Sequence, residues 1–502
     1  MDEVSKSIAR WAAINPGRLA VIDEHAVISY GELHERAGRW AGALQEAGVT
    51  PGSGVMLLLP NRAEFIEVLV ATIRTDVVPF VLNSQYTPED ILSLAAAAHT
   101  GLLITTRPLA GVMTFAREVP FQIWFVEDFD YDRYPSLEAL PVRRRTEIVF
   151  FTSGTTGKPK GVAVSKALFD LALPAAGSGA EPLLQLLCRP LFFRAHMTAA
   201  CNILQEGNTV VLSRQAEPGV WTNLIERHRI FFVSLGPSDL TRWLDHLEKG
   251  GGKFPPSVKH IMSTGAPLTH SLKKKLKKLL PHLRTTDLYG TSELSAIAMI
   301  DDDKWADKEG SCGRPAFFVN VKITDEHGRE LPPREVGEVW VKSRYRMREY
   351  YQDPEATSRA CAGDYVKTGD LGFLDEHGYL YLSGRKHDII NRSGFHFFPG
   401  EVENVLQDAP DVEEAVVLGM EHPEQTQEPV AVVRLRTQDR NDAEAETDKK
   451  RELLAHCESR LARYKVPSSI WFVGEIPLNA AGKADRRELA QWIAKQKDGT
   501  FR

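Results

Sequence analysis

The sequence predicts an α/β protein with a large N-terminal domain, made of two α/β subdomains and a small β subdomain, and a small α+β C-terminal domain. Short apolar runs alternate with helical patterns from residue 20 to about residue 265. Near residue 316 the pattern changes to strands and turns, and it changes again after Arg385. These changes place the domains at residues 1–385 and 386–502, a length that can bury more than one core.

The α/β region is indicated by apolar runs of strand length at residues 55–59 and 77–82. Ahead of them, residues 30–44 repeat apolar side chains at helical spacing. Further strand-like runs follow at residues 231–235 and 260–265. Strands that alternate with helices favour largely parallel sheets with crossover helices.

The β subdomain is predicted from residues 318–343 and 370–385, in which apolar and polar residues alternate. Each segment contains the turn sequence DEHG, which is typical of antiparallel hairpins.

The C-terminal domain begins with a helical pattern opened by Pro399. Residues 415–420 and 430–436 are apolar enough for strands, and a second helix is expected to begin near Asp448. Residues 437–450 are polar and rich in charge, so we expect a solvated loop there.

The composition excludes several classes of protein. A net charge of -6 gives no reason to expect nucleic acid as a partner. The five cysteines form no CxxC and no Cys/His cluster, so we expect neither a zinc site nor disulfides, and a reduced, cytoplasmic location. The first residues lack the apolar core of a signal peptide, and no stretch approaches the ~20 apolar residues that span a bilayer, so membrane insertion is not expected.

The longest run of charge is KKKLKK at residues 273–278. Leu272, Leu276, Leu279 and Leu280 form an apolar stripe around it, which predicts an amphipathic helix whose lysines face solvent. A peripheral anionic partner is the alternative interpretation.

Residues 151–161, FTSGTTGKPKG, follow an apolar run and carry the clearest chemical signal. Glycines allow close backbone approach, hydroxyls and amides donate to phosphate oxygens, and Lys158 and Lys160 add positive charge. A P-loop requires G-x-x-x-x-G-K-[ST], but Thr152 stands at its first glycine and Pro159 at its hydroxyl. The segment therefore predicts a nucleotide-phosphate site that is not a P-loop.

The string TSGTTGKPKG resembles the phosphate-loop signature of the adenylate-forming superfamily: acyl-CoA and aryl-CoA synthetases, adenylation domains of nonribosomal peptide synthetases, and beetle luciferases. Four further motifs resemble those of this family, in its order: YGTSE at 289–293, TGDL at 368–371, GRKHDIINRSGFHFFPGEVE at 384–403 and PLNAAGKADRREL at 477–489. Five ordered matches are far more specific than one.

The resemblance implies a reaction in which a carboxylate attacks the α-phosphorus of ATP, giving an acyl-adenylate and pyrophosphate, with Mg²⁺ as the metal. Two anions must meet, so charge neutralisation and alignment should be the main barrier terms. The catalytic residues implied are Lys483, Glu293, which engages Mg²⁺, and Ser292, whose hydroxyl touches phosphate. The residues implied to bind ATP are Thr152, Ser153, Gly154, Thr155, Thr156, Gly157, Lys158, Lys160, Gly265, Ala266, Pro267, Asp287, Tyr289, Gly290, Thr291, Asp370 and Arg385.

Within that set the resemblance implies that Asp370 and Arg385 contact the ribose and that Asp287 and residues 265–267 hold adenine. The acyl group then passes to a phosphopantetheine thiol, of CoA or of a carrier protein, after the mobile C-terminal domain rotates. The implied hinge is His387, where the family usually has Asp or Lys, and Gly394 lies at the implied pantetheine channel.

The acid pocket is predicted from residues 189–200, RPLFFRAHMTAA, at the place of the family's gate segment Pro-x-x-His-x-x-Gly. Phe193 replaces the His and His196 the Gly, so the gate is altered. No Asp is present to balance an α-ammonium, which disfavours ordinary α-amino acids. Phe193 and His196 favour a small aromatic or medium-chain acid, unless they pack in the core. Arg194 either faces solvent, pairs with a local acid or recognises an anionic group of the substrate.

The leading interpretation is an AMP-forming acid:CoA ligase for a small carboxylic acid, as a monomer or homodimer. A stand-alone enzyme that loads an acyl or peptidyl carrier protein shares every motif. A degenerate, non-catalytic nucleotide sensor is the alternative of another class. The joint presence of Glu293, Asp370, Arg385 and Lys483 disfavours that sensor.

Overall fold

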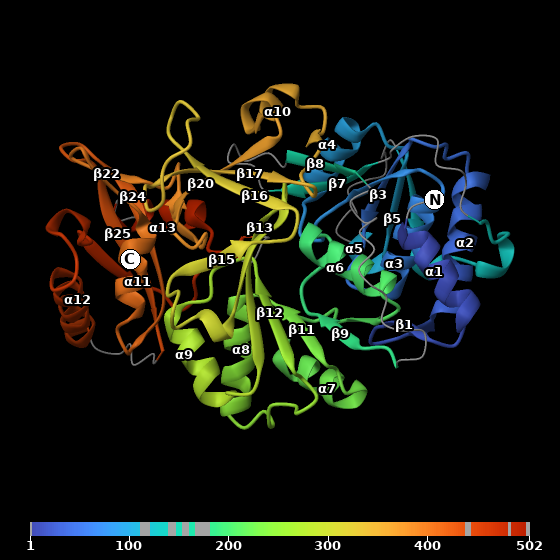
Figure 1. Ribbon diagram of the computed structural model, residues 1–502, viewed down its shortest axis with the longest axis horizontal. Coiled ribbons are helices and arrows are strands. Elements are labelled where there is room, and N and C mark those ends of the chain that lie inside the picture. The colour runs from blue at the N-terminus through green and yellow to red at the C-terminus, as the bar shows by residue number, and fades with distance from the viewer. Residues whose placement is uncertain are drawn as a thin grey trace.

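The computed structural model describes residues 3–110, 121–138, 147–152, 160–165, 181–436, 443–479 and 483–497. Two sheets with helices make up the large N-terminal part, and a third sheet with its own helices forms a separate body (Figure 1). The predicted fold class is confirmed. Within these residues no helix is both long and apolar enough to span a bilayer.

The first part of the chain forms a seven-stranded sheet. Its strands from β7 to β6 are parallel, while β7 and β8 make an antiparallel hairpin. In spatial order the strands are β18 (Glu349–Tyr350), β8 (Lys160–Ser165), β7 (Glu147–Thr152), β4 (Val78–Val81), β3 (Gly54–Leu58), β5 (Leu102–Thr105) and β6 (Gln122–Phe125). The helices here are α1 (Glu3–Ile14), α2 (Tyr30–Glu46), α3 (Ala63–Arg74), α4 (Pro88–Ala98) and α5 (Arg107–Ala110).

Helix α2 extends the helix predicted at residues 30–44. It begins where Ser29 accepts a hydrogen bond from the backbone of Glu32, whose side chain bonds back to Ser29. This capping box satisfies two of the backbone N–H groups that a helix start leaves unpaired.

A second region of parallel strands carries the predicted runs at residues 231–235 and 260–265. In spatial order its strands are β13 (Arg284–Thr291), β12 (His260–Thr264), β11 (Phe232–Leu235), β9 (Leu184–Leu187), β10 (Thr209–Leu212), β1 (Leu19–Ile22) and the antiparallel β2 (Val27–Ser29). Its helices are α6 (Arg194–Gln205), α7 (Pro218–His228), α8 (Pro237–Glu248) and α9 (His270–Leu279). Because β13 to β1 are parallel, their carboxyl ends meet at one edge, where open α/β sheets bind ligands.

Antiparallel strands continue this sheet beyond β13 and form the predicted β subdomain. They are β14 (Ser295–Asp301), β15 (Ser311–Pro315), β21 (Leu380–Arg385), β20 (Tyr365–Leu374), β17 (Gly337–Ser343) and β16 (Val319–Thr324), with β19 (Cys361–Ala362) beside β20 and helix α10 (Pro354–Ala360) nearby. The hairpin at the second DEHG is confirmed. After the first DEHG the partner strand begins only at Gly337, because Pro332 and Pro333 lack the N–H groups that a ladder needs.

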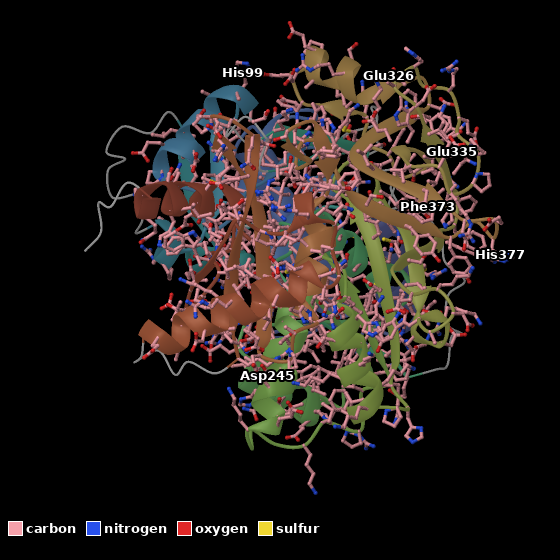
Figure 2. All side chains as sticks on the ribbon, turned by 90° about the vertical axis from the view of Figure 1, so that its left-hand side faces the viewer. His99, Asp245, Glu326, Glu335, Phe373 and His377 are labelled. Atoms are coloured by element: carbon pink, nitrogen blue, oxygen red, sulfur yellow. The ribbon has the colours of Figure 1, made fainter. Side chains whose placement is uncertain are left out.

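Polar and charged side chains are exposed at the outer rim of this β subdomain. Glu326, Glu335 and His377 are exposed there and project away from the sheet (Figure 2). The subdomain therefore buries its apolar side against the rest of the large domain and leaves its rim to solvent.

The C-terminal sheet consists of β23 (Phe395–Phe397), β22 (Ile390–Arg392), β25 (Thr426–Leu435) and β24 (Val412–His422), with β26 (Ser469–Phe472) beside β25. Helices α11 (Pro399–Gln407), α12 (Ala443–Glu458) and α13 (Arg486–Lys497) complete the domain. The helix opened by Pro399 and both predicted strands are confirmed.

The loop predicted at residues 437–450 is wrong in its second half, because α12 begins at Ala443 and not near Asp448. This stretch is rich in Ala, Glu and Lys, which are strong helix formers. Lys450 pairs with Glu446, one turn earlier, at 2.7 Å. Helix propensity thus decides the structure of a segment whose charge suggested a loop.

Helix α9 confirms the amphipathic helix predicted around residues 273–278. Leu272 and Leu276 are buried, but Leu279, predicted in the stripe, is 39% exposed at the helix end. Its lysines contact carboxylates of neighbouring elements: Lys275 lies 2.6 Å from Asp245 and 2.7 Å from Glu248, and Lys277 pairs with Asp302.

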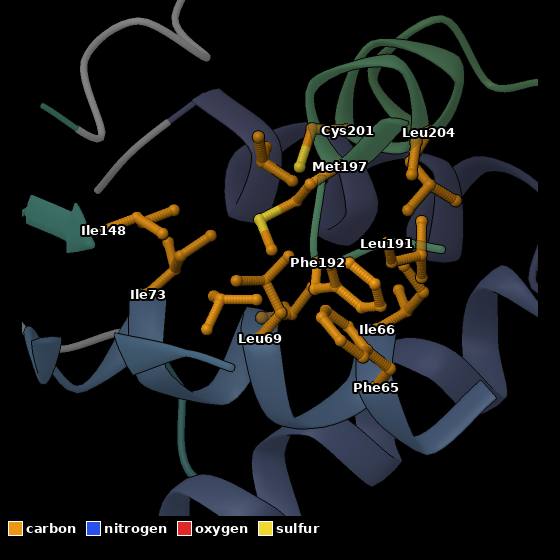
Figure 3. Close-up of a cluster of buried hydrophobic side chains, with 14 of the residues drawn as sticks. Phe65, Ile66, Leu69, Ile73, Ile148, Leu191, Phe192, Met197, Cys201 and Leu204 are labelled. Atoms are coloured by element: carbon orange, nitrogen blue, oxygen red, sulfur yellow. The ribbon is translucent and has the colours of Figure 1, made fainter. Parts of the chain in front are cut away.

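One face of α6 is fixed against α3 by apolar side chains. Met197, Cys201 and Leu204 pack near Phe65 and Leu69 in a shared core (Figure 3). This packing holds the start of α6 at the carboxyl ends of the parallel strands.

Candidate active site

The predicted phosphate loop joins β7 to β8. Thr152 and Lys160 are the last paired residues of that hairpin, so the loop connects the two strands at this end. Residues 153–158, predicted to bind phosphate, lie outside the described residues. The Nζ of Lys160 lies 5.4 Å from the ring centroid of Tyr350.

Glu293, the predicted metal-binding carboxylate, lies in a turn directly after β13. Tyr350 donates from its hydroxyl to Oε1 of Glu293 at 2.9 Å, and Met347 donates from its backbone N–H to the Glu293 carbonyl. Because β18 pairs with β8, Tyr350 links Glu293 to the strand that follows the phosphate loop. Sequence reasoning missed Tyr350, which no motif used in the prediction includes.

Arg194 is buried, with 4% exposure, and so does not face solvent. Its guanidinium donates to the backbone carbonyl of Ser292 at 2.5 Å and to that of Tyr345. Burial lowers the pKa of Arg194 to about 9, and the charge of Glu293 opposes this shift. These contacts favour a role in holding the Ser292–Glu293 turn, and a contact with the acid stays a prediction.

Tyr289 and Arg385 both contact the Asp370 carboxylate, the first by a hydrogen bond and the second by an ion pair, as expected if the three share a nucleotide site. Tyr289 donates from its hydroxyl to Oδ2 of Asp370 at 2.5 Å, and Nε of Arg385 lies 3.3 Å from Oδ1. Asp370 and Arg385 are cross-strand neighbours on β20 and β21. Burial, and then the Asp370 charge, raise the pKa of Tyr289, so its hydroxyl stays protonated.

Gly290 and Thr291 lie at the end of β13. A Cβ at Gly290 would meet the Ser295 carbonyl oxygen at 2.2 Å, so only glycine fits there. The buried Thr291 hydroxyl has no hydrogen-bond partner among the described residues.

Asp287 is buried beside the loop at residues 265–267. It accepts from the backbone N–H of Leu268 at 3.3 Å and lies 3.5 Å from Nζ of Lys273. Burial raises the pKa of Asp287, and Lys273 opposes the shift. Asp287 therefore holds this loop, in which Ala266 and Pro267 are exposed. A contact of Asp287 with adenine stays a prediction.

Lys483 comes from the opposite end of the chain and lies in a short turn. Its backbone carbonyl accepts from Asn479 at 2.7 Å, and Leu478 and Ala484 form an isolated bridge across the turn. Lys483 as a whole is exposed, but protein atoms surround its ammonium group and take water from it, which disfavours the charged form. The pKa of Lys483 is lowered first by this desolvation and then by Arg385, with Asp370 and Glu293 acting in the opposite direction. The ammonium thus lies within electrostatic reach of the predicted nucleotide site.

The donor set fits Mg²⁺ held jointly by protein and nucleotide. In the part of the chain that the structure describes, no three His, Cys, Asp or Glu side chains are grouped so that they could hold a metal ion by themselves. Mg²⁺ usually takes one or two carboxylates and completes its shell with phosphates and water. A single carboxylate, Glu293, beside the phosphate hairpin suits that mode.

The segment that joins the two domains is a turn after β21. His387 is exposed in it, and its ring would lie 3.7 Å from a Cβ at Gly369. Ser393 (φ 52°) and Gly394 (φ 87°) form the two-residue turn between β22 and β23. Both φ angles are positive, as a type I′ turn requires. The hinge and channel roles of His387 and Gly394 stay predictions.

The predicted acid-pocket residues lie at the start of α6. Phe193 is half-buried and His196 is 3% exposed, with Nε2 of His196 3.4 Å from the Ser234 hydroxyl. Arg189, which sequence reasoning left without a role, has its guanidinium 5.7 Å from the Phe193 ring centroid. Its position two residues after the end of β9, at the carboxyl edge of the sheet, was the signal that could have found it.

Comparisons with known proteins agree with this geometry. The family model described as AMP-binding enzyme matches residues 8–351, and the AMP-binding enzyme C-terminal domain matches residues 401–483. A 2-succinylbenzoate–CoA ligase of Geobacillus kaustophilus (strain HTA426) is 33% identical over 99% of both chains. The o-succinylbenzoate CoA synthetase of Bacillus subtilis, solved with its acyl-adenylate intermediate, has a TM-score of 0.83 at 27% identity, covering 96% of this chain and 97% of that chain. An amide bond synthetase from Marinactinospora thermotolerans has the same TM-score at 28% identity, covering 97% and 99%.

Fold and site together define an enzyme that joins a carboxylic acid to AMP. The chain belongs to the AMP-binding enzyme family. The predicted membership of the adenylate-forming superfamily, and with it the prediction of an AMP-forming ligase, is confirmed.

Proposed function

We propose that the protein is an ATP-dependent acid:CoA ligase that activates a small aromatic acid. The observation that carries this proposal is that the charges of Arg385, Asp370 and Glu293 act on the pKa of Lys483, a residue from the other end of the chain. This lysine of the C-terminal domain is thus close enough for its pKa to respond to the two carboxylates to which nucleotide-binding roles are assigned. That arrangement suits the adenylation half of the reaction.

In the first half-reaction, the acid carboxylate attacks the α-phosphorus and pyrophosphate leaves. Asp370 and Arg385 orient the ribose, and the Lys483 ammonium bridges the attacking oxygen and the α-phosphate. A compact ammonium on a flexible stem suits such a moving contact. Glu293 would hold Mg²⁺, which when bound would supply neutralisation of the charge that develops on the leaving group.

In the second half-reaction, the domain of residues 386–502 rotates against residues 1–385 about His387. Rotation withdraws Lys483 and brings Gly394 to the path of the pantetheine arm. The CoA thiol then attacks the acyl carbonyl, and AMP leaves. Arg385 pairs with Asp370 of the large domain, whereas Asp388 lies 3.9 Å from Arg486 of the C-terminal domain. The position of His387 between these two residues supports its assignment as the hinge.

The aromatic class of the acid rests on the altered gate and on the relatives. The half-buried Phe193 ring lies 4.5 Å from the Phe192 ring, centroid to centroid, at an interplanar angle of 46°. Relatives named for 2-succinylbenzoate match almost the whole chain. We assign the protein to the cytoplasm, as a monomer or homodimer, with a small acid and CoA as its substrates.

The proposal is tested by exchange of labelled pyrophosphate into ATP with a panel of aromatic, medium-chain and α-amino acids. We expect exchange with an aromatic acid and thioester formation when CoA is added. Strong preference for an α-amino acid would contradict the acid class. Accumulation of AMP without a CoA thioester would support loading of a carrier protein instead, and the absence of exchange with every acid would support a nucleotide sensor.

A further inference from the structure

Two phenylalanines of the β subdomain are exposed directly before β16. Phe317 is 84% exposed and Phe318 is 57% exposed. They lie in the connection from β15 to β16, and β16 is an edge strand, with β17 as its neighbour among the described strands. Large apolar side chains that stay in contact with water at such an edge indicate a surface that binds another body.

The backbone at Phe318 is strained. Its φ angle is 60°, in the left-handed region that glycine occupies freely and that bulky residues rarely adopt. Because the ring is exposed, packing in the core does not explain why an aromatic residue stands there. Strain of this kind is concentrated at functional sites.

Positive charge is concentrated around the same connection. Residues 310–324 and 339–348 contain six basic residues and no acidic one, although the whole chain has a net charge of -6. The two segments come together because β16 pairs with β17, with Val319 opposite Ser343. A local excess of positive charge on a negatively charged protein attracts anionic partners to that place.

Cations and aromatic rings share the outer face of this sheet. Alternate residues of β16 and β17 are buried against the core, so the residues between them point outward. Nζ of Lys322 lies 4.8 Å from the Trp340 ring centroid and 4.3 Å from that of Tyr365. The Arg344 guanidinium lies 5.8 Å from the ring centroid of Phe318.

Three cations of this face have no carboxylate partner. Lys342 pairs with Asp364 at 2.7 Å and is thereby neutralised. Lys322, Arg344 and Lys367 contact aromatic rings, and none of them forms an ion pair within the described part of the chain. We call these three residues, together with Phe317 and Phe318, the basic face; its charge is available to a partner.

We propose that the basic face docks the protein reversibly on an anionic phospholipid bilayer. Cations attract anionic head groups, and exposed aromatic rings enter the boundary between head groups and acyl chains. A second copy of the chain suits this face less well, because a two-fold dimer would set its cations against each other. The docking goes beyond the proposed function, since no residue of the basic face is assigned to catalysis.

The test is sedimentation of the whole protein with vesicles of phosphatidylcholine that contain about 40% phosphatidylglycerol. We expect binding at about 50 mM salt, loss of binding at about 0.5 M salt, and little binding to phosphatidylcholine alone. The double variant Phe317→Ser/Phe318→Ser should lower the partition coefficient about tenfold or more. Arg344→Gln should lower it about fivefold, the effect of one basic residue near an anionic surface.

Phe318→Gly separates docking from folding. Glycine adopts the φ angle of this position without strain, so the urea midpoint should stay or rise while binding to the vesicles falls. Arg329→Gln and Val336→Ser are the matched controls, because both residues are exposed in the connection at the opposite ends of β16 and β17. Both controls should bind as the wild type does.

Pyrophosphate exchange, measured without vesicles, should be unchanged in every variant, so a failure of docking leaves the ligase function intact. Absence of binding to the anionic vesicles at low salt would overturn the inference. Equal binding by Phe317→Ser/Phe318→Ser and the wild type would also overturn it. A dimer in analytical ultracentrifugation that the double variant abolishes would assign the basic face to a second copy instead.

Discussion

The Tyr350 hydroxyl donates to the Glu293 carboxylate at 2.9 Å, across 57 positions of the chain. Tyr350 pairs with Val162 in the sheet, next to the strand that follows the phosphate loop. One tyrosine therefore joins the carboxylate proposed to hold Mg²⁺ to the hairpin proposed to hold the phosphates. Hydrogen bonds of this kind fix a metal-binding carboxylate in one orientation.

Tyr350→Phe should raise the Mg²⁺ concentration that half-saturates pyrophosphate exchange about tenfold, because Glu293 loses its orienting bond. The binding of Mn²⁺ with ATP, followed by electron paramagnetic resonance, should weaken in parallel. Tyr351→Phe is the control, since within the described part of the chain the Tyr351 hydroxyl forms a hydrogen bond only with the Gln352 side chain. Equal metal dependence in both variants would refute the orienting role.

Asp370→Asn should remove discrimination between ATP and its 2′,3′-dideoxy analogue. The carboxylate accepts from Tyr289 and pairs with Arg385, which holds it in place to accept from ribose hydroxyls. We expect a rise of about tenfold or more in KM for ATP and little change for the dideoxy nucleotide. Unaltered discrimination would exclude the ribose contact.

Arg194→Leu should lower the free energy of unfolding by about 2–4 kcal/mol, since two buried carbonyls lose charged donors. The order of preference among acids should stay the same, because both Nη groups contact backbone. Urea denaturation and the acid panel provide the two readouts. A changed acid preference with unchanged stability would return Arg194 to the acid pocket.

His196 should make the protein sensitive to acid. Its pKa is about 3 in the folded protein against 6.5 for the free side chain, so the unfolded chain binds more protons between these values. Stability is complete above the unfolded value and falls as pH drops below it, by about 1.4 kcal/mol between pH 7.5 and 5.5. His196→Gln should remove this part of the loss, measured by urea midpoints, whereas exposed His99→Asn should retain it (Figure 2). An identical pH dependence in both variants would contradict the buried, neutral state.

The sequence was sufficient for the elements whose local pattern agrees with the fold. The parallel strands, the Ser29-capped helix and the helix at Pro399 follow from apolar spacing and capping residues. The start of α12 at Ala443 was missed because polar composition was weighed above helix propensity. Pairings between distant segments, such as β18 with β8, leave no local signal.

The candidate site likewise contains some residues that sequence motifs predicted and others that they did not. Ordered motifs predicted roles for Glu293, Asp370, Arg385 and Lys483, and in the fold the charges of the first three act on the pKa of Lys483. Tyr350 and Arg189 escaped prediction because their contacts depend on tertiary packing and not on a motif. Arg194 is the opposite case: it lies in the segment predicted to form the acid pocket, but its guanidinium donates to the backbone carbonyl of Ser292.

The proposed reaction requires Lys483 to act at the nucleotide site, and Lys483→Ala in pyrophosphate exchange tests this requirement most directly. We expect exchange to fall at least about 100-fold, ATP binding to stay within about threefold, and thioester formation from a synthetic acyl-adenylate to persist. Lys495→Ala, at an exposed lysine on α13, should behave as wild type. Undiminished exchange by Lys483→Ala would contradict the central claim.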